Sequence, residues 1–143
     1  MPNTFRSNCP ITSALDIVGD KWSLVIIKQI LFERKSTFKD FTGSTEAIAT
    51  NILSSRLKML EEYGILSKTK LPENKKTNIY FLTDKGLGLT PTLMELTFWS
   101  KDHIQEFHPN LNLDQQITAA QKNKEAAYES IIKNYKNWLQ ELS

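Results

Sequence analysis

The sequence has only one cysteine, Cys9, among its 143 residues, so no disulfide can form within the chain. Its longest run of aliphatic residues, 24–27, is four residues long, whereas a membrane-spanning helix needs about 20. The first nine residues lack the apolar stretch of a secretory signal. The absence of these three features predicts a cytoplasmic protein in a reducing compartment, with no membrane partner.

Residues that could form a catalytic or metal site are also scarce. The only two histidines, His103 and His108, match no zinc-binding spacing, and Cys9 has no identifiable histidine partner for nucleophilic chemistry. Gly86 and Gly88 do not follow a strand in the form that a phosphate-binding loop requires. We therefore expect no enzyme activity, no metal and no cofactor.

The hydrophobic pattern alternates between helical and strand periods in a recognisable order. It predicts helices over 12–19, 21–32, 38–41, 50–63, 91–107 and 114–142, and strands over 65–71 and 77–82. Thr12 or Ser13, Asp20 and Asp114 are the expected N-caps, and Gly64 is the expected helix terminator. The fold predicted is mainly α with a small β-hairpin wing, a winged helix-turn-helix with an extra C-terminal helix. We expect a DNA-binding domain over 1–108 and a helical extension over 109–143 that serves packing or dimerisation.

The helix predicted from residue 50 has one apolar face and one face of short polar side chains. On a helical wheel its leucines lie opposite a polar group of side chains that can reach base edges, Asn51, Ser54, Ser55 and Lys58. Arg56 lies beside the leucines and is assigned to a phosphate or to an internal ion pair. Thr50 begins the same helix and joins the expected DNA contacts. The alternative is an ordinary amphipathic surface helix.

Positive charge is concentrated in this helix and the hairpin. Residues 50–80 contain six Lys or Arg and three Glu, whereas residues 101–143 contain five Lys and six acids. Phosphate contacts are made by such positive groups. The predicted contacts to phosphates or the minor groove are Lys68, Lys75, Lys76 and Asn78, together with Arg56. The alternative for Lys75 and Lys76 is a hairpin tip that simply faces solvent.

Several segments in order resemble the HxlR-type family of bacterial winged-helix regulators. The resemblance extends from Cys9 to about Ser100 and includes Cys9–Ile11, Leu15–Ser23, Phe38–Phe41, Ile48–Leu53, Arg56–Glu61, Gly64–Leu66, Tyr80–Gly86 and Trp99–Ser100. It implies a homodimer that binds double-stranded operator DNA with two half-sites, mostly as a repressor. Two positions depart from the family pattern. Thr37 replaces a usual Arg, which removes one potential phosphate contact, and Ala47 replaces a frequent Gly.

The resemblance also gives Cys9 a meaning, because in several similar regulators the cysteine of this Cys-Pro pair senses oxidants or electrophiles. Such chemistry requires a thiolate, which a helix N-terminus or a nearby cation favours. A structural cysteine at the dimer interface is the alternative. A small-molecule or oxidant effector therefore stays open, as does a third function, a winged-helix module that binds protein without binding DNA.

The last predicted helix has an apolar stripe at three- and four-residue spacings, which must be buried. Its members are Tyr128, Ile131, Ile132, Tyr135, Trp138, Leu139 and Leu142. We favour dimerisation through this stripe, with packing on its own chain as the alternative.

Overall fold

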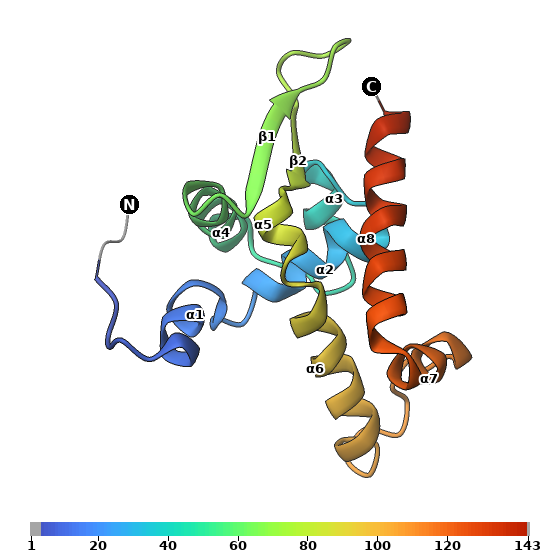
Figure 1. Cartoon of the computed structure of the whole chain (residues 1–143). Coiled ribbons are helices and arrows are strands. Elements are labelled where there is room, and N and C mark those ends of the chain that lie inside the picture. The colour runs from blue at the N-terminus through green and yellow to red at the C-terminus, as the bar shows by residue number, and fades with distance from the viewer. Residues whose placement is uncertain (1–3, 143) are drawn as a thin grey trace. The chain divides into compact units, whose positions relative to one another are not determined.

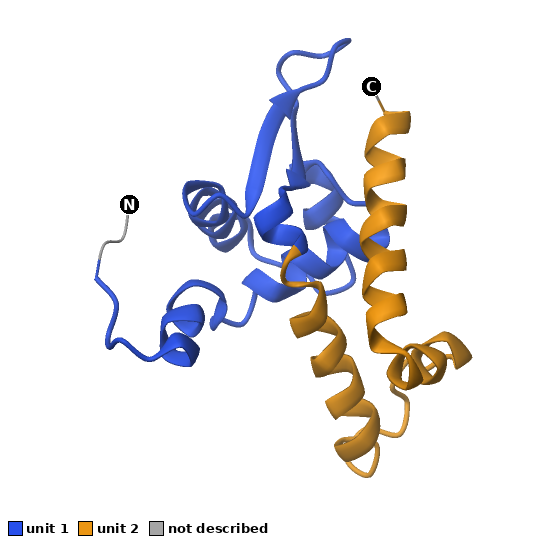
Figure 2. Cartoon of the chain, viewed as in Figure 1, with its two compact units in different colours: residues 1–87 blue, residues 88–143 orange. Residues whose placement is uncertain are grey.

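The computed structural model describes residues 4–142, which belong to two compact units, residues 1–87 and 88–143 (Figure 2). The elements of the first unit are α1 (Pro10–Val18), α2 (Ser23–Glu33), α3 (Phe38–Thr42), α4 (Thr50–Glu62), β1 (Leu66–Lys70), β2 (Asn78–Leu82) and α5 (Asp84–Leu87). Those of the second are α6 (Thr90–His103), α7 (Gln115–Lys122) and α8 (Lys124–Glu141), as Figure 1 labels them. The functional boundary expected at residue 108 stays a prediction.

Helix α2 lies at the centre of the first unit, as its nearly uniform apolar composition predicts. Ile26, Ile27 and Ile30 are fully buried. Asp20 stabilises its first turn, because Oδ2 accepts hydrogen bonds from the backbone N–H groups of Trp22 and Ser23, both at 3.0 Å. The N-cap is nevertheless Trp22 and the helix begins at residue 23, so the expected N-cap Asp20 and the expected start at 21 are wrong, although the Asp20 carboxylate does hold the start of the helix.

Strands β1 and β2 form an antiparallel hairpin in which Leu66 pairs with Leu82 and Lys68 with Tyr80. The two leucines are buried and anchor the base of the hairpin in the core. At the tip, Asn74 Nδ2 donates to Thr77 Oγ1 at 2.9 Å, which orders the turn. The hairpin follows α4 directly, which is the place that the sequence predicts for the wing (Figure 1).

The end of α4 is held against the segment that follows β2. Gly64 has φ +75°, a left-handed conformation that suits glycine, and begins the path into β1. The Thr83 hydroxyl donates to the Gly64 carbonyl at 2.5 Å, and the Lys85 ammonium donates to the Tyr63 carbonyl at 3.0 Å. These contacts fix the hairpin relative to α4.

The second unit consists of three helices joined by polar contacts. Pro91 lies in the first turn of α6, as expected from its fixed φ and missing N–H. Lys124 at the start of α8 pairs with Glu95 of α6 at 2.7 Å. Within this unit α8 contacts both α6 and α7. Among the described residues no helix is both long and apolar enough to cross a bilayer.

Three further predicted helix boundaries are wrong. Helix α1 begins at Pro10 with Cys9 as N-cap, because proline at the first position needs no N–H partner. Helix α6 ends at His103 and a turn follows, so the predicted end near 107 is too late. The single helix expected over 114–142 is broken at Asn123, whose non-helical backbone ends α7 and whose side chain accepts from the Ala126 N–H at 3.4 Å to begin α8.

Candidate nucleic-acid interface

Helix α4 presents a polar face to solvent along most of its length. Its leucines, Leu53, Leu57 and Leu60, are buried in the first unit. The opposite face is exposed and carries Asn51, Ser54, Ser55, Lys58 and Glu62, and Thr50 is exposed in the first turn. The orientation predicted from the helical wheel is therefore confirmed. The small donors and acceptors on this face are of the kind that contacts base edges in the major groove.

The turn that leads into α4 is held by α2. Glu46 accepts from the Lys28 ammonium at 2.6 Å and from the Gln29 side-chain amide at 2.8 Å. The hydrogen bond from Lys28 holds the pKa of Glu46 below its usual value. Sequence reasoning missed this network, because 17 and 18 residues separate the partners and no local pattern connects them.

Thr37, at the position where the family has an Arg, caps α3. Its hydroxyl accepts from the Asp40 N–H at 3.2 Å, and the Asp40 carboxylate accepts from the Thr37 N–H at 3.1 Å. This reciprocal pair is a capping box. Thr37 therefore stabilises the first helix of the helix-turn-helix, where an Arg would offer a charge to phosphate.

Arg56 is turned toward the body of the unit and has protein partners. Its guanidinium lies 3.6 Å from Asp20 Oδ1 and donates to Ser55 Oγ at 3.1 Å. The internal ion pair, one of the two roles expected for this residue, is thus present. A contact with phosphate stays a prediction.

The residues predicted to contact DNA from the wing differ in their exposure and in their protein partners. Lys75 and Lys76 are exposed at the tip, whereas Lys68 pairs with Glu61 of α4 at 3.7 Å. Asn78 is half-buried, and its Oδ1 is buried with no hydrogen-bond partner in the described structure. The tip lysines are therefore the predicted wing residues best placed to meet a phosphate.

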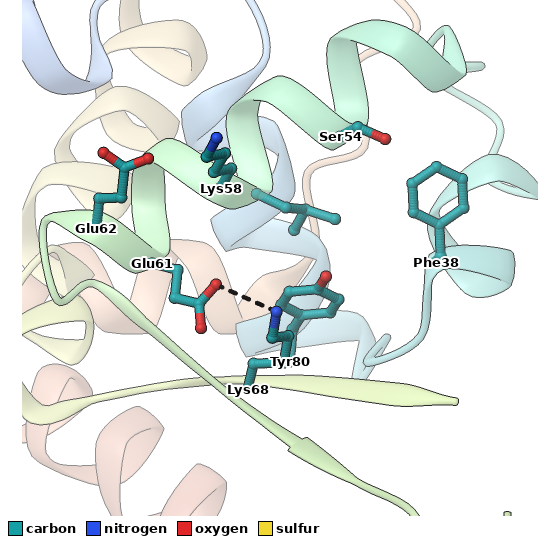
Figure 3. Close-up of a pocket in the computed structure, with 8 residues that line it drawn as sticks. Phe38, Ser54, Lys58, Glu61, Glu62, Lys68 and Tyr80 are labelled. Atoms are coloured by element: carbon teal, nitrogen blue, oxygen red, sulfur yellow. Dashed lines mark ion pairs between the residues drawn. The ribbon is translucent and has the colours of Figure 1, made fainter. Parts of the chain in front are cut away.

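A cavity of about 400 Å³ lies between α4 and the hairpin (Figure 3). Its lining comes from α3, α4, β1 and β2 and consists of Phe38, Ser54, Leu57, Lys58, Glu61, Glu62, Lys68 and Tyr80. Phe38 and Tyr80 are residues of this surface to which the sequence analysis assigned no DNA contact. No helical or strand period indicates that both side chains line the same cavity beside α4.

Cys9 is exposed at the N-terminus of α1. Hydrogen bonds from Thr12, first its backbone N–H and then its hydroxyl, lower the pKa of the Cys9 thiol, and the Ile11 N–H adds to the effect. A thiol in this position has more of the reactive thiolate at neutral pH than an ordinary cysteine. Within residues 4–142 no cluster of three or more His, Cys, Asp or Glu is arranged to hold a metal ion.

A helix pair followed by a β-hairpin, with an exposed polar second helix, defines a winged helix-turn-helix transcription regulator. The chain belongs to the HxlR-like helix-turn-helix family, which matches residues 17–108. It is a DNA-binding transcription regulator and not an enzyme.

The chain is also similar to individual transcription regulators of known sequence or structure. The chain is 34% identical over 93 residues to the HTH-type transcriptional regulator YodB of Bacillus subtilis, covering 64% of this chain and 82% of YodB. The crystal structure of PA1607 superposes with a TM-score of 0.66 at 33% identity, covering 76% of this chain and 73% of that one. The quinone-bound form of YodB superposes with a TM-score of 0.54 at 29% identity, over 66% of this chain and 99% of that one.

Proposed function

We propose that the chain is a repressor that binds a two-half-site operator as a homodimer, with α4 in the major groove and the hairpin tip on the adjacent backbone. The observation that carries the proposal is the exposed polar face of α4, followed directly in the same compact unit by a wing with two free lysines at its tip. Two copies related by a two-fold axis would meet half-sites separated by about one helical turn, near 34 Å, or a multiple of it.

We assign base reading to Asn51 and Ser55, which lie along the middle of the exposed face, with Thr50 and Ser54 at its edge and Lys58 placed to neutralise a phosphate. Asn51 is the residue best suited to a bidentate contact with adenine. Asn51→Ala should cost about 1–3 kcal/mol of discrimination between a duplex selected from a random pool and the unselected pool. Asn137→Ala on the exposed face of α8 is the matched control. An equal loss on both duplexes would contradict base reading.

Phosphate contacts at the wing are tested through salt dependence. The slope of log affinity against log salt should fall by up to about 1.8 when Lys75 and Lys76 are both changed to Ala, because each phosphate contact contributes about 0.9. Lys122→Ala with Lys133→Ala, which removes two exposed lysines of the second unit, should leave the slope unchanged. An unchanged slope in the wing variant would remove the wing from the interface.

Repression itself is tested by transcription in vitro. A promoter that overlaps the selected site should be silenced as the site fills, and a site placed upstream should have no effect. Stimulation from the upstream site would identify an activator instead. Failure of the wild-type chain to bind any duplex would favour the protein-binding module.

A second candidate function adds an electrophile sensor to the first. Its support is the exposed Cys9 thiol with its lowered pKa, together with the quinone-bound form of the relative YodB. Diamide or a quinone should release the chain from its selected duplex, and Cys9→Ser should bind but fail to respond. Wild-type binding that survives both reagents would remove this function and leave repression intact.

A further inference from the structure

We propose that the cavity between α4 and the hairpin receives the sugar–phosphate backbone of one DNA strand. The inference rests on the proposed reading of DNA by α4 and adds a contact site between the reading face and the wing tip. The residues that would hold the strand are Ser54, Lys58, Tyr80 and Phe38.

Three donors in the cavity lack protein partners. The side chains of Ser54, Lys58 and Tyr80 form no hydrogen bond or ion pair with any residue between 4 and 142. Tyr80 is half-buried, and its hydroxyl points toward α4 and into the space beside it (Figure 3). The Tyr80 hydroxyl is therefore available to a partner from outside the chain. Two hydroxyls and an ammonium are together suited to a phosphate oxygen.

The same cavity has an apolar wall that a free anion would not need. Leu57 is almost completely buried, and the Phe38 ring stands beside Ser54 at one end (Figure 3). A deoxyribose presents carbon-bound hydrogens next to each phosphate, so a surface with donors beside apolar carbon fits a sugar–phosphate unit. The cavity is also on the route that a strand must take from the α4 face to the wing.

The charged residues that line the cavity determine at which end of it the DNA strand would pass. Glu61 and Glu62 lie at the end away from Phe38 and Ser54 (Figure 3), and Glu61 already pairs with Lys68. The carboxylates repel a phosphate, so the remaining positive charge, that of Lys58, attracts the strand toward the Ser54 end. Lys68 then acts mainly by neutralising Glu61, which is a different role from the direct phosphate contact predicted from the sequence.

The experiment measures binding affinity by fluorescence anisotropy on two DNA samples, each about three helical turns long. One is a single duplex selected from a random pool, and the other is the unselected pool. Tyr80→Phe and Ser54→Ala should each weaken binding to both duplexes by the same factor, on the order of tenfold for a lost hydrogen bond to a charged group. Neither removes a charge, so the salt slope between about 50 and 200 mM KCl should not change. Lys58→Gln should lower the slope by about 0.9.

Matched controls are Tyr128→Phe, Ser130→Ala and Lys133→Gln on α8, which should bind as the wild type does. Ser54 is exposed, so its variant tests the site even where Tyr80→Phe is poorly folded. A further test uses a series of duplexes, each with a single phosphate replaced by a neutral methylphosphonate at a different position. At one position the replacement should weaken binding by the wild type but not by Tyr80→Phe.

Three results would overturn the backbone site while the proposed regulator still binds DNA. The first is wild-type affinity in both Tyr80→Phe and Ser54→Ala, and the second is a loss of affinity for the selected duplex alone. The third is a series in which no methylphosphonate weakens wild-type binding without also weakening Tyr80→Phe binding. A wild-type chain that binds neither duplex would instead contradict the proposed function. The two failures are thus distinguishable.

Discussion

At the scale of single residues, the turn before α4 contains a strained alanine. Ala47 has φ +55°, a left-handed conformation that costs an L-residue with a Cβ about 1–2 kcal/mol. Ala47→Gly should therefore raise the free energy of unfolding, by about 0.5–1 kcal/mol after the larger unfolded-state entropy of glycine is included. Urea titration measures the change.

Ala119→Gly in α7 is the matched control, because that alanine is in a regular helix, where glycine costs about 0.5–1 kcal/mol. The two variants should move stability in opposite directions. A destabilised Ala47→Gly would mean that the turn does not hold residue 47 in the left-handed region.

Gly86 is required for a different reason, the close approach of two backbones. A Cβ at this position would lie 2.4 Å from the Ile65 carbonyl oxygen. Gly86→Ala should therefore force the hairpin base away from α5 and cost about 1–3 kcal/mol, the range found for overpacked cores. At Gly43 the nearest atom to an added Cβ is 3.3 Å away, so Gly43→Ala should cost much less. Similar melting temperatures for the two variants would refute the assignment.

Single residues also mark how far sequence reasoning extends. The inward leucines of α4 and the role of Asp20 could be predicted, because helical period and capping chemistry are local. The start of α1 after Cys9 and the break at Asn123 were not predicted, since neighbouring residues are equally acceptable as helix ends. The positive φ of Ala47 could be suspected only because the family often has glycine there.

At the scale of elements, Glu46 positions α4 relative to α2. Glu46→Ala would remove one of the two acceptors of Lys28 and leave the fully buried Gln29 amide without its partner, at a cost of about 1–2 kcal/mol. Because the turn is then less well held, affinity for a selected duplex should fall more than affinity for an unselected pool. Glu46→Gln keeps an acceptor for Gln29 and should recover part of the selectivity.

Glu33→Ala is the control, because Glu33 also pairs with Lys28, at 2.9 Å, but lies on α2 and does not touch the turn. It should leave the ratio of selected to unselected binding unchanged. Equal ratios for Glu46→Ala and wild type would show that the network serves stability alone.

The same network makes a pH prediction. The pKa of Glu46 is lowered in the folded chain, so its contribution to stability is complete above the ordinary value of 4.5 and is lost as pH falls through the folded pKa. The stability difference between wild type and Glu46→Gln should therefore be largest near neutral pH and shrink on acidification. Urea titrations at several pH values measure it, and a difference that grows in acid would contradict the ion pair.

The order of elements was the most predictable part of the fold, and the contacts between them the least. Helix, turn, helix and hairpin follow from period changes along the chain. The cavity lined by Phe38 and Tyr80, and the ion pair that joins Lys68 to Glu61, depend on how β1 and β2 lie against α4. Nothing local in the sequence encodes that arrangement.

At the scale of the whole molecule, apolar side chains remain exposed on both compact units. Ile11 of α1 is 73% exposed and Leu15 50%, while Leu96 and Trp99 of α6 are 49% and 56% exposed. The stripe on α8 is different: Tyr135 is fully buried, and only Leu142 at its end is exposed. We therefore propose that the exposed apolar side chains of α1 and those of α6 each contribute to homodimer contacts, and that most of the α8 stripe serves packing within one chain.

Charged substitutions distinguish the two surfaces. Ile11→Glu and Trp99→Glu should each shift the chain from dimer to monomer in sedimentation velocity, because a carboxylate buried in an apolar interface without a partner is strongly unfavourable. Leu142→Glu, an equally drastic change at the exposed end of the α8 stripe, should leave the dimer intact. The monomeric variants should also lose the second half-site, so that affinity falls on a full operator but not on a single half-site. A dimer broken only by Leu142→Glu would restore the α8 stripe as the interface.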